Sequence, residues 1–317
     1  MKSVAKRPPS VAVIDIGSNS IKVLVAARDA SGTLRELKSR TLEARISAGI
    51  SAEKPKLTED GMRRGLGAIR ELLMEAEPYR PAKVLLVATS AVRDATNGAE
   101  FRARVKAAVK HDIRILSGEE EANAIGRGLT CDPALADLRT FYLFDLGGGS
   151  LECLSFRDRQ VRQALSLQLG CVRLTEKFVT DPTAPFPAAA RGAIADHVKQ
   201  VVAEAGFKFD LPGAAGVAMG GTVSTVRAIV GAGSGKRAEQ VSPVIQVALL
   251  ERLLKHVAVL PLADRQRVPG LPPARADVFP AALATLLAVA EAGGLVEFRH
   301  SFHNLRWGLA ADALAGL

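Results

Sequence analysis

The chain has 317 residues, a length that is typical of two domains. Hydrophobic residues make up 48% and charged residues 24%, a composition that is typical of globular proteins and excludes a disordered or fibrous chain. Lys and Arg number 42 against 33 Asp and Glu, and the net charge of +9 favours a polyanionic ligand such as a phosphate chain, a nucleotide or a nucleic acid. Because aromatic residues make up only 4%, a groove that stacks nucleic-acid bases is disfavoured, and we expect recognition of phosphate groups.

The N-terminal segment begins with two predicted strands and a helix. Residues 11–14 form a continuous apolar run, residues 21–25 are rich in β-branched side chains, and turn-forming residues separate the two segments. We therefore expect a strand, a turn and a second strand. Further on, Thr58 is predicted to cap a helix, because apolar side chains follow it at helical spacing at Met62, Leu66, Ile69 and Leu73.

Strands and helices continue to alternate along the first part of the chain. Residues 84–88 and 113–116 have the character of short buried strands. Between them, Asn97 and Glu100 have the spacing of a capping box, which predicts that a helix begins at Asn97. Residues 117–122 indicate the start of another helix. This alternation predicts an α/β domain in which helices cover a sheet.

The pattern of the first two strands recurs in the middle of the chain. Residues 141–144 lead into an aspartate, a glycine-rich turn and, at 151–154, a segment in which apolar residues flank one position of any type, in the order found at the N-terminus. The two aspartates, Asp15 and Asp145, are 130 positions apart. A repeat at this distance predicts two duplicated domains that face each other across a cleft, with a boundary near residues 122–140.

Each repeated turn has the composition of a phosphate-binding loop. Glycines let an anion approach the backbone N–H groups, and side-chain donors are added by Ser18, Asn19, Ser20 and Ser150. An aspartate beside a bound anion is useful only if it holds a cation such as Mg²⁺ or orients water. One Asp-Gly turn alone would indicate no more than a hairpin, but two copies with matching flanks favour a phosphate site.

Cysteine spacing and the apolar runs indicate the compartment. The cysteines lack the paired spacing of a disulfide framework or a zinc site and are expected to be small buried residues of a reduced protein: Cys131, Cys153 and Cys171. The apolar run at 11–14 is too short for a signal peptide, and the run at 281–290 is shorter than a membrane span. We expect a cytoplasmic protein with no membrane partner.

At the two glycine-rich turns and at several further segments, the sequence resembles the exopolyphosphatase and guanosine-pentaphosphate phosphatase (Ppx/GppA) family. The resemblance extends in order along nearly the whole chain. Its most specific elements are Ser-Gly-x-Glu-Glu-Ala and Gly-Gly-Gly-Ser-x-Glu, which separate the family from its kinase and actin relatives. The segments that carry it are residues 13–20, 88–95 with Asn97, 115–122, 144–152, 166–170 with 173–176, and 220–222.

The resemblance implies an α/β fold of two duplicated actin-like (ribonuclease H-like) domains with a cleft between them. The N-terminal domain would comprise residues 1–122 and the C-terminal domain residues 123–317. A C-terminal helix at about 304–317 is a candidate to pack back on the N-terminal domain. We expect no metal-dependent accessory domain of the kind found in longer family members, since 317 residues leave no room for it. Whether two chains pair stays open, a homodimer being one possibility.

The resemblance also implies roles for particular residues. Asp15 and Asp145 would hold Mg²⁺ or another divalent cation. Glu121 would activate the attacking water, and Glu152 would be a second acidic group at the catalytic site. Arg93 would contact phosphate from the cleft wall. The glycine-rich turns would cradle two phosphate groups with Gly17, Ser18, Asn19, Ser20, Gly147, Gly148, Gly149 and Ser150.

The implied activity is hydrolysis of a phosphoanhydride, with release of terminal orthophosphate from inorganic polyphosphate. Guanosine pentaphosphate is the alternative substrate within the family, because both substrates present the same terminal anhydride. The positive charge and the missing accessory domain favour polyphosphate. From other functional classes, a kinase and an actin-like nucleotide-binding module remain as alternatives on the same fold.

Several residues allow two interpretations. Glu119, Glu120 and Glu121 in a row also fit an ordinary first helical turn, and only the motif register favours Glu121 as the water activator. His300 and His303 have the spacing of half a metal site, although a cap or surface pair fits as well. The family's closing motif has an acid where this chain has Trp307, which leaves the role of that segment open. Phosphate contacts and a solvated basic face are both consistent with Arg265, Arg267 and Arg275.

Overall fold

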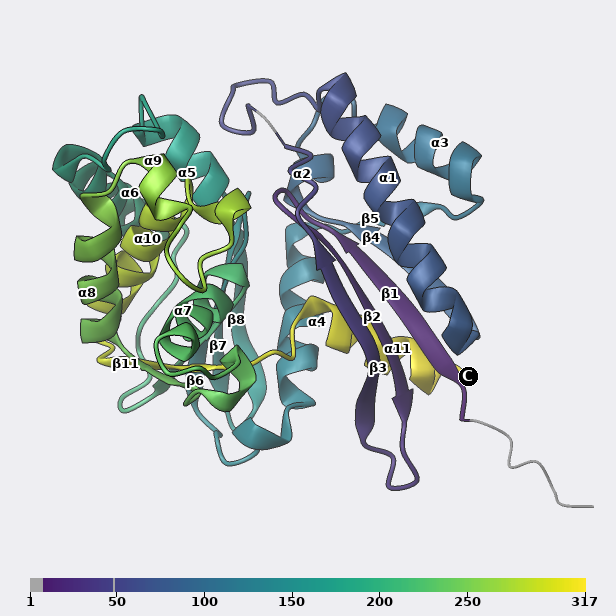
Figure 1. Cartoon of the computed structure of the whole chain (residues 1–317). Helices are drawn as coiled ribbons and strands as arrows, with labels where there is room; N and C mark the ends of the chain where they lie inside the picture. The colour runs from purple at the N-terminus through teal and green to yellow at the C-terminus, as the bar shows by residue number, and fades with distance from the viewer. Residues whose placement is uncertain (1–7, 48) are drawn as a thin grey trace, which may run out of the picture.

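The computed structural model describes residues 8–47 and 49–317, which form two mixed β-sheets covered by helices (Figure 1). The first sheet has the strand order β3-β2-β1-β4-β5. Its strands are β1 (Ser10–Ile16), β2 (Ile21–Arg28), β3 (Leu34–Leu42), β4 (Lys83–Ala88) and β5 (Ile113–Ile115). The second sheet has the order β10-β11-β9-β6-β7-β8. Its strands are β6 (Phe141–Leu146), β7 (Leu151–Arg157), β8 (Gln160–Leu167), β9 (Ala215–Met219), β10 (Val244–Gln246) and β11 (Glu297–His300).

The two sheets repeat one topology. In the first sheet β1, β2 and β3 form an antiparallel meander, and β4 and β5 continue the sheet parallel to β1. In the second sheet β6, β7 and β8 form the same meander, β9 and β11 continue it in parallel, and β10 is added antiparallel at the edge. The predicted α/β fold of two duplicated domains is therefore confirmed.

Helices cover the outer face of each sheet. On the first sheet these are α1 (Glu59–Ala76) and α3 (Gly98–Val109), and the short α2 (Ser90–Arg93) follows β4. The second half contributes α5 (Cys171–Phe178), α6 (Ala188–Glu204), α7 (Gly221–Ala232), α8 (Val247–Ala258), α9 (Leu262–Arg265) and α10 (Phe279–Ala292). The central helix α10 is apolar on all sides because it is buried against the helices α5, α6, α7 and α8. No helix among the described residues has both the length and the apolar character that crossing a membrane requires.

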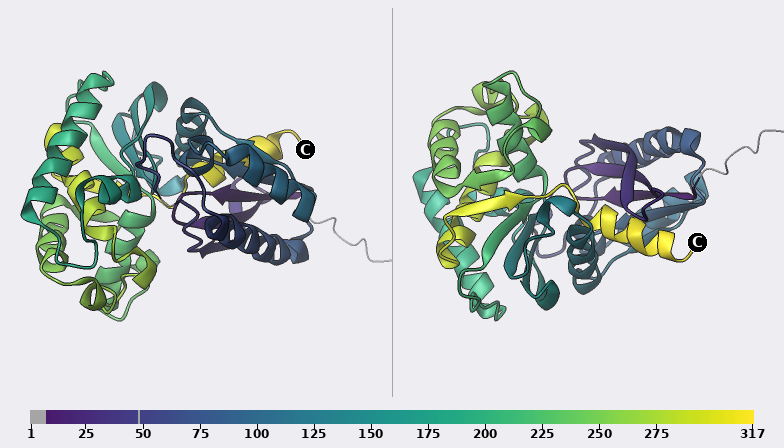
Figure 2. Two further views of the ribbon diagram at one scale, coloured as in Figure 1. Left: turned by 90° about the horizontal axis from the view of Figure 1, so that it is seen from above. Right: turned by 90° about the horizontal axis from the view of Figure 1, so that it is seen from below.

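Two helices join the halves of the molecule. Helix α4 (Gly118–Thr130) follows the last strand of the first sheet and packs on β7 and β8, whereas α11 (Leu305–Ala315) follows the second sheet and packs on β1 and β2 (Figures 1 and 2). The predicted domain boundary after residue 122 falls inside α4. Side chains of both sheets and both helices form one apolar layer that includes Val13, Leu24, Ile125, Leu143, Leu154 and Leu309.

Both predicted helix starts are confirmed, because α1 begins after Thr58 and α3 after Asn97, but only one of the two predicted caps is present. Thr58 caps α1, since its side chain accepts a hydrogen bond from Gly61 N, as predicted. The predicted capping box at Asn97 and Glu100 is wrong. The Asn97 side chain instead accepts from Leu57 N at 2.8 Å and donates to Leu57 O at 2.9 Å, so it fastens the segment before α1.

Candidate active site

The two predicted loops are built alike. Asp15 lies near the end of β1 and Asp145 near the end of β6, and each strand runs into a tight turn. In the first turn Gly17 N donates to Ser20 O at 3.2 Å, and in the second Gly147 N donates to Ser150 O at 3.0 Å. The sequence repeat therefore corresponds to a repeat of backbone geometry at the strand ends.

The two turns lie directly against each other across the domain boundary. A Cβ atom placed on Gly148 would lie 2.8 Å from the Ser18 Cβ. On Gly149 a Cβ would lie 2.8 Å from the Ser18 Oγ and 2.4 Å from the Ser90 Oγ. Since real Cβ atoms do not approach this closely, only glycine fits at both positions, and the glycines are what lets the loops come together.

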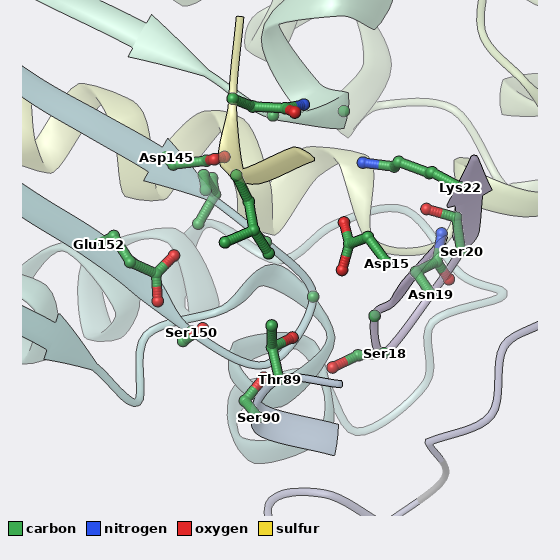
Figure 3. A pocket seen from close by; sticks show the side chains of 18 of the residues that line it. Asp15, Ser18, Asn19, Ser20, Lys22, Thr89, Ser90, Asp145, Ser150 and Glu152 are labelled. Atoms are coloured by element: carbon green, nitrogen blue, oxygen red, sulfur yellow. The ribbon is translucent and has the colours of Figure 1, made fainter. Parts of the chain in front are cut away.

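A cavity of about 70 Å³ lies between these turns. Figure 3 shows the Asp15 and Asp145 carboxyl groups pointing into it from opposite sides, with Glu152 on the side of Asp145. The predicted site residues that line the cavity are Asp15, Gly17, Ser18, Asn19, Ser20, Glu121, Asp145, Gly147, Gly148, Ser150 and Glu152. The structure thus brings together residues from both halves of the chain.

A third glycine turn closes the cavity between β9 and α7. Gly220 has a φ of 93°, and a Cβ there would lie 2.9 Å from an Asp145 carboxyl oxygen. A Cβ on Gly221 would lie 2.4 Å from the Arg275 guanidinium. The Arg275 side chain therefore enters the cavity wall from a segment remote in sequence, and the interpretation as a solvated basic face is wrong for this arginine, which is 8% exposed.

Strand pairing adds a residue that the sequence analysis missed. Asp15 pairs with Lys22 in the register of β1 and β2, and Asp145 pairs with Glu152 in the register of β6 and β7. Lys22 and Glu152 therefore occupy equivalent positions in the two domains, with opposite charge, and both line the cavity. Alignment of the two repeats residue by residue contains this signal, because both positions lie seven residues after their aspartate.

The start of α4 separates the three neighbouring glutamates. Ser117 caps the helix by accepting from Glu120 N at 3.1 Å, and the Glu120 carboxylate accepts from Ser117 N at 2.8 Å. Glu120 also pairs with Arg114 on the surface. Glu121 is 5% exposed and faces the cavity, whereas Glu119 is exposed. Helix geometry therefore directs Glu121, and not its neighbours, to the site.

Two predicted phosphate-binding residues do not line the cavity. Arg93 lies behind Glu121 and donates to its carboxyl oxygen at 2.8 Å and to Leu116 O at 3.1 Å. Gly149 is packed between the loops. In this arrangement Arg93 contacts Glu121, which faces the cavity, and the missing side chain of Gly149 allows the two loops to pack closely.

Burial dominates the electrostatics of the four carboxyl groups. It raises the pKa of Asp145 to about 6 and also raises that of Asp15, while Lys22 lowers both. Burial raises the pKa of Glu121 to about 7, although the hydrogen bond from Arg93 lowers it. Burial, together with the charges of Glu121 and Asp145, raises the pKa of Glu152 well above its ordinary value. Asp145 and Glu121 therefore change protonation state close to neutral pH, and burial favours the protonated form of Asp15 and Glu152 as well.

Several polar atoms of the cavity wall have no protein partner. Among the described residues, Ser18 Oγ and Asn19 Oδ1 are buried without a hydrogen bond, and so is the Nε of Arg275. Ser18 Oγ and Arg275 Nε are donors that suit an anion, because an unpaired buried polar group is costly unless a ligand satisfies it. Asn19 donates through Nδ2 to Glu43 at 2.9 Å, so its orphaned oxygen is an acceptor and suits a cation or water.

The other candidates have structural roles. Arg265 is 1% exposed and donates to the carbonyl groups of Pro182, Ala184 and Ala276, so neither interpretation from the sequence holds for it. Arg267 is exposed and pairs with Asp264. His300 and His303 have different hydrogen-bond and ion-pair partners. His300 contacts Arg227, and His303 contacts Asp132. Cys153 and Cys171 are buried as expected, and Cys131 is half-buried.

Comparison with known proteins agrees with this architecture. A sequence profile described as the Ppx/GppA phosphatase family matches residues 24–315. A crystal structure of a Ppx/GppA family member from Aquifex aeolicus is 23% identical, with a TM-score of 0.77 over 97% of this chain and 98% of that chain. An exopolyphosphatase from Cytophaga hutchinsonii is 21% identical, with a TM-score of 0.83 over 97% of this chain and 98% of that one.

A third solved structure, described as an exopolyphosphatase-like protein, is 25% identical, with a TM-score of 0.85 over 97% of this chain and 98% of that chain. These likenesses extend over both sheets and the two helices that join them. The profile covers the second glycine-rich turn, the start of α4 and the turn after β9, while the first turn precedes its match. The chain belongs to the Ppx/GppA phosphatase family.

Proposed function

We propose that this protein hydrolyses phosphoanhydrides and releases terminal orthophosphate from inorganic polyphosphate. The observation that supports this most strongly is the single cavity lined by both glycine-rich turns, Asp15, Asp145 and the buried Glu121. Transfer of a phosphoryl group to water needs positioning, charge neutralisation and an oriented water molecule, and no covalent nucleophile. The name of the Cytophaga hutchinsonii relative, an exopolyphosphatase, points to the same substrate class.

In this proposal the two turns hold the terminal and the penultimate phosphate groups. The backbone N–H groups and the Ser18 hydroxyl donate to phosphate oxygens. Glu121 accepts a proton from the attacking water, for which its pKa of about 7 is suited, because a general base works best near the operating pH. Lys22 and Arg275 add positive charge where the phosphate oxygens would gather.

The same cavity has oxygen donors suited to Mg²⁺. No group of three or more His, Cys, Asp or Glu side chains within residues 8–47 and 49–317 is placed to hold a metal ion by itself. Mg²⁺, however, is commonly held by one or two carboxylates together with substrate phosphates and water. Asp15 and Asp145 would supply the two carboxylates. Bound there, the ion would neutralise phosphate charge that four nearby acidic side chains otherwise repel.

Guanosine pentaphosphate is the second candidate substrate, and an adjoining cavity favours it. This cavity of about 600 Å³ shares Lys22, Gly221 and Arg275 with the site and includes the aromatic side chains of Phe302 and Trp307. A nucleoside stacks well on aromatic side chains. A terminal phosphate could therefore occupy the same cradle with a nucleoside beside it.

A phosphate-release assay distinguishes these functions. Polyphosphate, guanosine pentaphosphate and ATP are compared at matched salt, each with and without Mg²⁺. We expect Mg²⁺-dependent release that is fastest with polyphosphate. Faster release from guanosine pentaphosphate would favour the second candidate. Phosphate transfer only when an acceptor alcohol is present would identify a kinase, and slow release from every substrate would indicate an actin-like nucleotide-binding module.

A further inference from the structure

The segment Arg173–Glu176 belongs to the family resemblance but has no part in the proposed chemistry. It lies in the first turns of α5, directly after the second glycine-rich turn. Arg173 is only 7% exposed, and its guanidinium makes three hydrogen bonds, to Gly149 O at 3.0 Å, Ile50 O at 2.6 Å and Asp94 Oδ2 at 2.7 Å. A buried arginine with all its bonds directed at chosen acceptors indicates a specific positional role.

The three acceptors of Arg173 come from both halves of the molecule. Gly149 belongs to the glycine-rich turn of the C-terminal half, next to the helix that carries Arg173. Ile50 and Asp94 belong to the N-terminal half, in the loop before α1 and in the residue that ends α2. All three bonds therefore exist together only while the two halves are in contact.

The contact with Asp94 continues to the acid in the cavity. The other carboxyl oxygen of Asp94 lies 3.5 Å from the Nε of Arg93. Arg93 in turn donates to Glu121 at 2.8 Å. The side chains of Asp94 and Glu121 are 15% and 7% exposed, so this row of alternating charges is largely shielded from water. A shielded charge is strongly oriented by its neighbours.

We propose that Arg173 is a positioning residue that couples contact between the two domains to the placement of Glu121, through Asp94 and Arg93. When the halves meet, Arg173 fixes Asp94, Asp94 fixes the Arg93 guanidinium, and Arg93 holds the Glu121 carboxyl toward the cavity. The acid is then correctly placed only when both phosphate-binding turns are together. This inference rests on the proposed role of Glu121 as the group that activates water.

The same helix offers a matched control. Glu176 also reaches from α5 to the N-terminal half, where it accepts from Gly49 N at 2.8 Å and from Ser51 N and Oγ at 3.0 Å each. It joins the domains as Arg173 does, but none of its partners belongs to the row that leads to Glu121. A variant at Glu176 therefore weakens domain contact without touching Asp94 or Arg93.

The kinetic test compares Arg173→Gln, Asp94→Asn and Glu176→Gln in the full chain, with polyphosphate as substrate. We expect the first two to lower kcat about tenfold with KM changed less than about threefold, because misplacing a reacting group by a fraction of an ångström is costly. Glu176→Gln should change kcat less than twofold. If Arg173→Gln does not fold, Asp94→Asn still tests the proposal, because it alters the bond between Arg173 and Asp94 and leaves the bond to Gly149 in the glycine-rich turn unchanged.

The decisive comparison repeats these variants in a Glu121→Gln background. If Arg173 acts through Glu121, Arg173→Gln and Asp94→Asn cause no further loss of the residual rate there. The same tenfold loss in both backgrounds, or an equal loss of kcat from Glu176→Gln, would overturn the proposal, because it would mean that Arg173 only joins the domains.

A measurement without substrate separates this proposal from the proposed function. The Nε–Hε resonance of Arg93, identified by its loss in Arg93→Lys, reports whether that guanidinium is held. We expect a sharp signal in the parent protein and in Glu176→Gln, and a broadened or lost signal in Arg173→Gln and Asp94→Asn. An unchanged signal in all variants refutes the coupling. If the parent protein releases no phosphate from polyphosphate, the proposed function fails while this measurement still decides the coupling.

Discussion

At the scale of single residues, Glu121 shows how the fold sets the chemistry of a side chain. Burial raises its pKa to about 7, and the hydrogen bond from Arg93 keeps it from rising further. A base in this state is largely protonated in mild acid and ionised in mild alkali. The charged groups around it are Arg93, Asp15, Asp145 and Glu152, on four different elements.

We therefore expect kcat/KM on polyphosphate to fall below about pH 7, with an apparent pKa shared by the coupled carboxyl groups. Arg93→Gln removes the positive charge that lowers the pKa of Glu121, so the acid limb should move to higher pH. A pH–rate profile between pH 5 and 9 checks this. Glu120→Gln is the control, since it changes an exposed neighbour that faces away from the cavity. An acid limb below pH 5, or one that Arg93→Gln leaves in place, contradicts this assignment.

The sequence sufficed to predict the residues that lie on the repeated turns, because Asp15 and Asp145 have the same neighbours in both copies. Lys22 could have been found in the same way, because it lies seven residues after Asp15 as Glu152 does after Asp145, but the segments remote in sequence could not. The sequence did not assign Arg275, which reaches the cavity from a distant segment. The position of Arg93 behind Glu121 likewise follows from tertiary packing. Contacts between distant segments leave no local pattern to read.

At the scale of elements, the site depends on the crossing of α4 and α11. A Cβ on Gly308 would lie 1.9 Å from Ala124 O, and one on Gly128 would lie 2.1 Å from Asn304 O. The two backbones are therefore in direct contact where the helices cross. Helix α4 carries Glu121, and the segment before α11 contributes Asn304 to the cavity wall.

Gly308→Ala should accordingly lower the free energy of unfolding by about 2 kcal/mol or more, since backbone on both sides leaves no room for a methyl group. Urea unfolding measures this change. Gly192→Ala is the matched control within α6, because nothing lies within 4 Å of the added atom, and helix propensity predicts a gain of about 0.5–1 kcal/mol. Equal effects of the two substitutions would show that the crossing tolerates separation.

Helix caps show where local sequence was sufficient. Thr58 and Ser117 cap their helices through bonds to residues three positions away, which a sequence pattern can contain. Asn97 has the same local pattern, but the backbone of Leu57 competes for its side chain and wins with two hydrogen bonds. The outcome there was decided by a residue 40 positions away.

At the scale of the whole molecule, the acidic cluster makes stability depend on pH. Burial raises the pKa values of Asp15, Asp145, Glu121 and Glu152 above those of the unfolded chain. For Asp145 and Glu121, whose folded pKa values are about 6 and about 7, the folded state binds more protons than the unfolded state between the ordinary carboxyl pKa of about 4 and these values. Stability therefore falls as pH rises through this window.

We expect the free energy of unfolding, measured in urea with a chelator present, to be lower at pH 7.5 than at pH 5 by about 2 kcal/mol or more. Glu121→Gln should reduce this difference, because the amide does not titrate. A free energy of unfolding that increases from pH 5 to pH 7.5 would contradict this prediction, because it would mean that the folded state does not raise the pKa values of these carboxyl groups.

The duplicated architecture was the most predictable feature of the whole molecule. Two apolar runs around similar turns were enough to predict paired domains, because strand pairing around a short turn is local. The position of α11 against β1 and β2 joins residues nearly 300 positions apart, as in the bond from Arg306 to Val23 O. For α11 the sequence pattern alone did not predict which sheet the helix packs on, and the N-terminal domain was a candidate only through the family resemblance.

The central claim is that the facing turns bind a phosphate chain while Glu121 activates water. The most direct test is Glu121→Gln, measured for phosphate release from polyphosphate and for polyphosphate binding at the same salt concentration and pH. We predict that release falls by at least about 100-fold while the Kd changes less than about threefold, because the amide keeps the shape of the side chain but cannot accept the proton. Release at the rate of the parent protein would contradict the account.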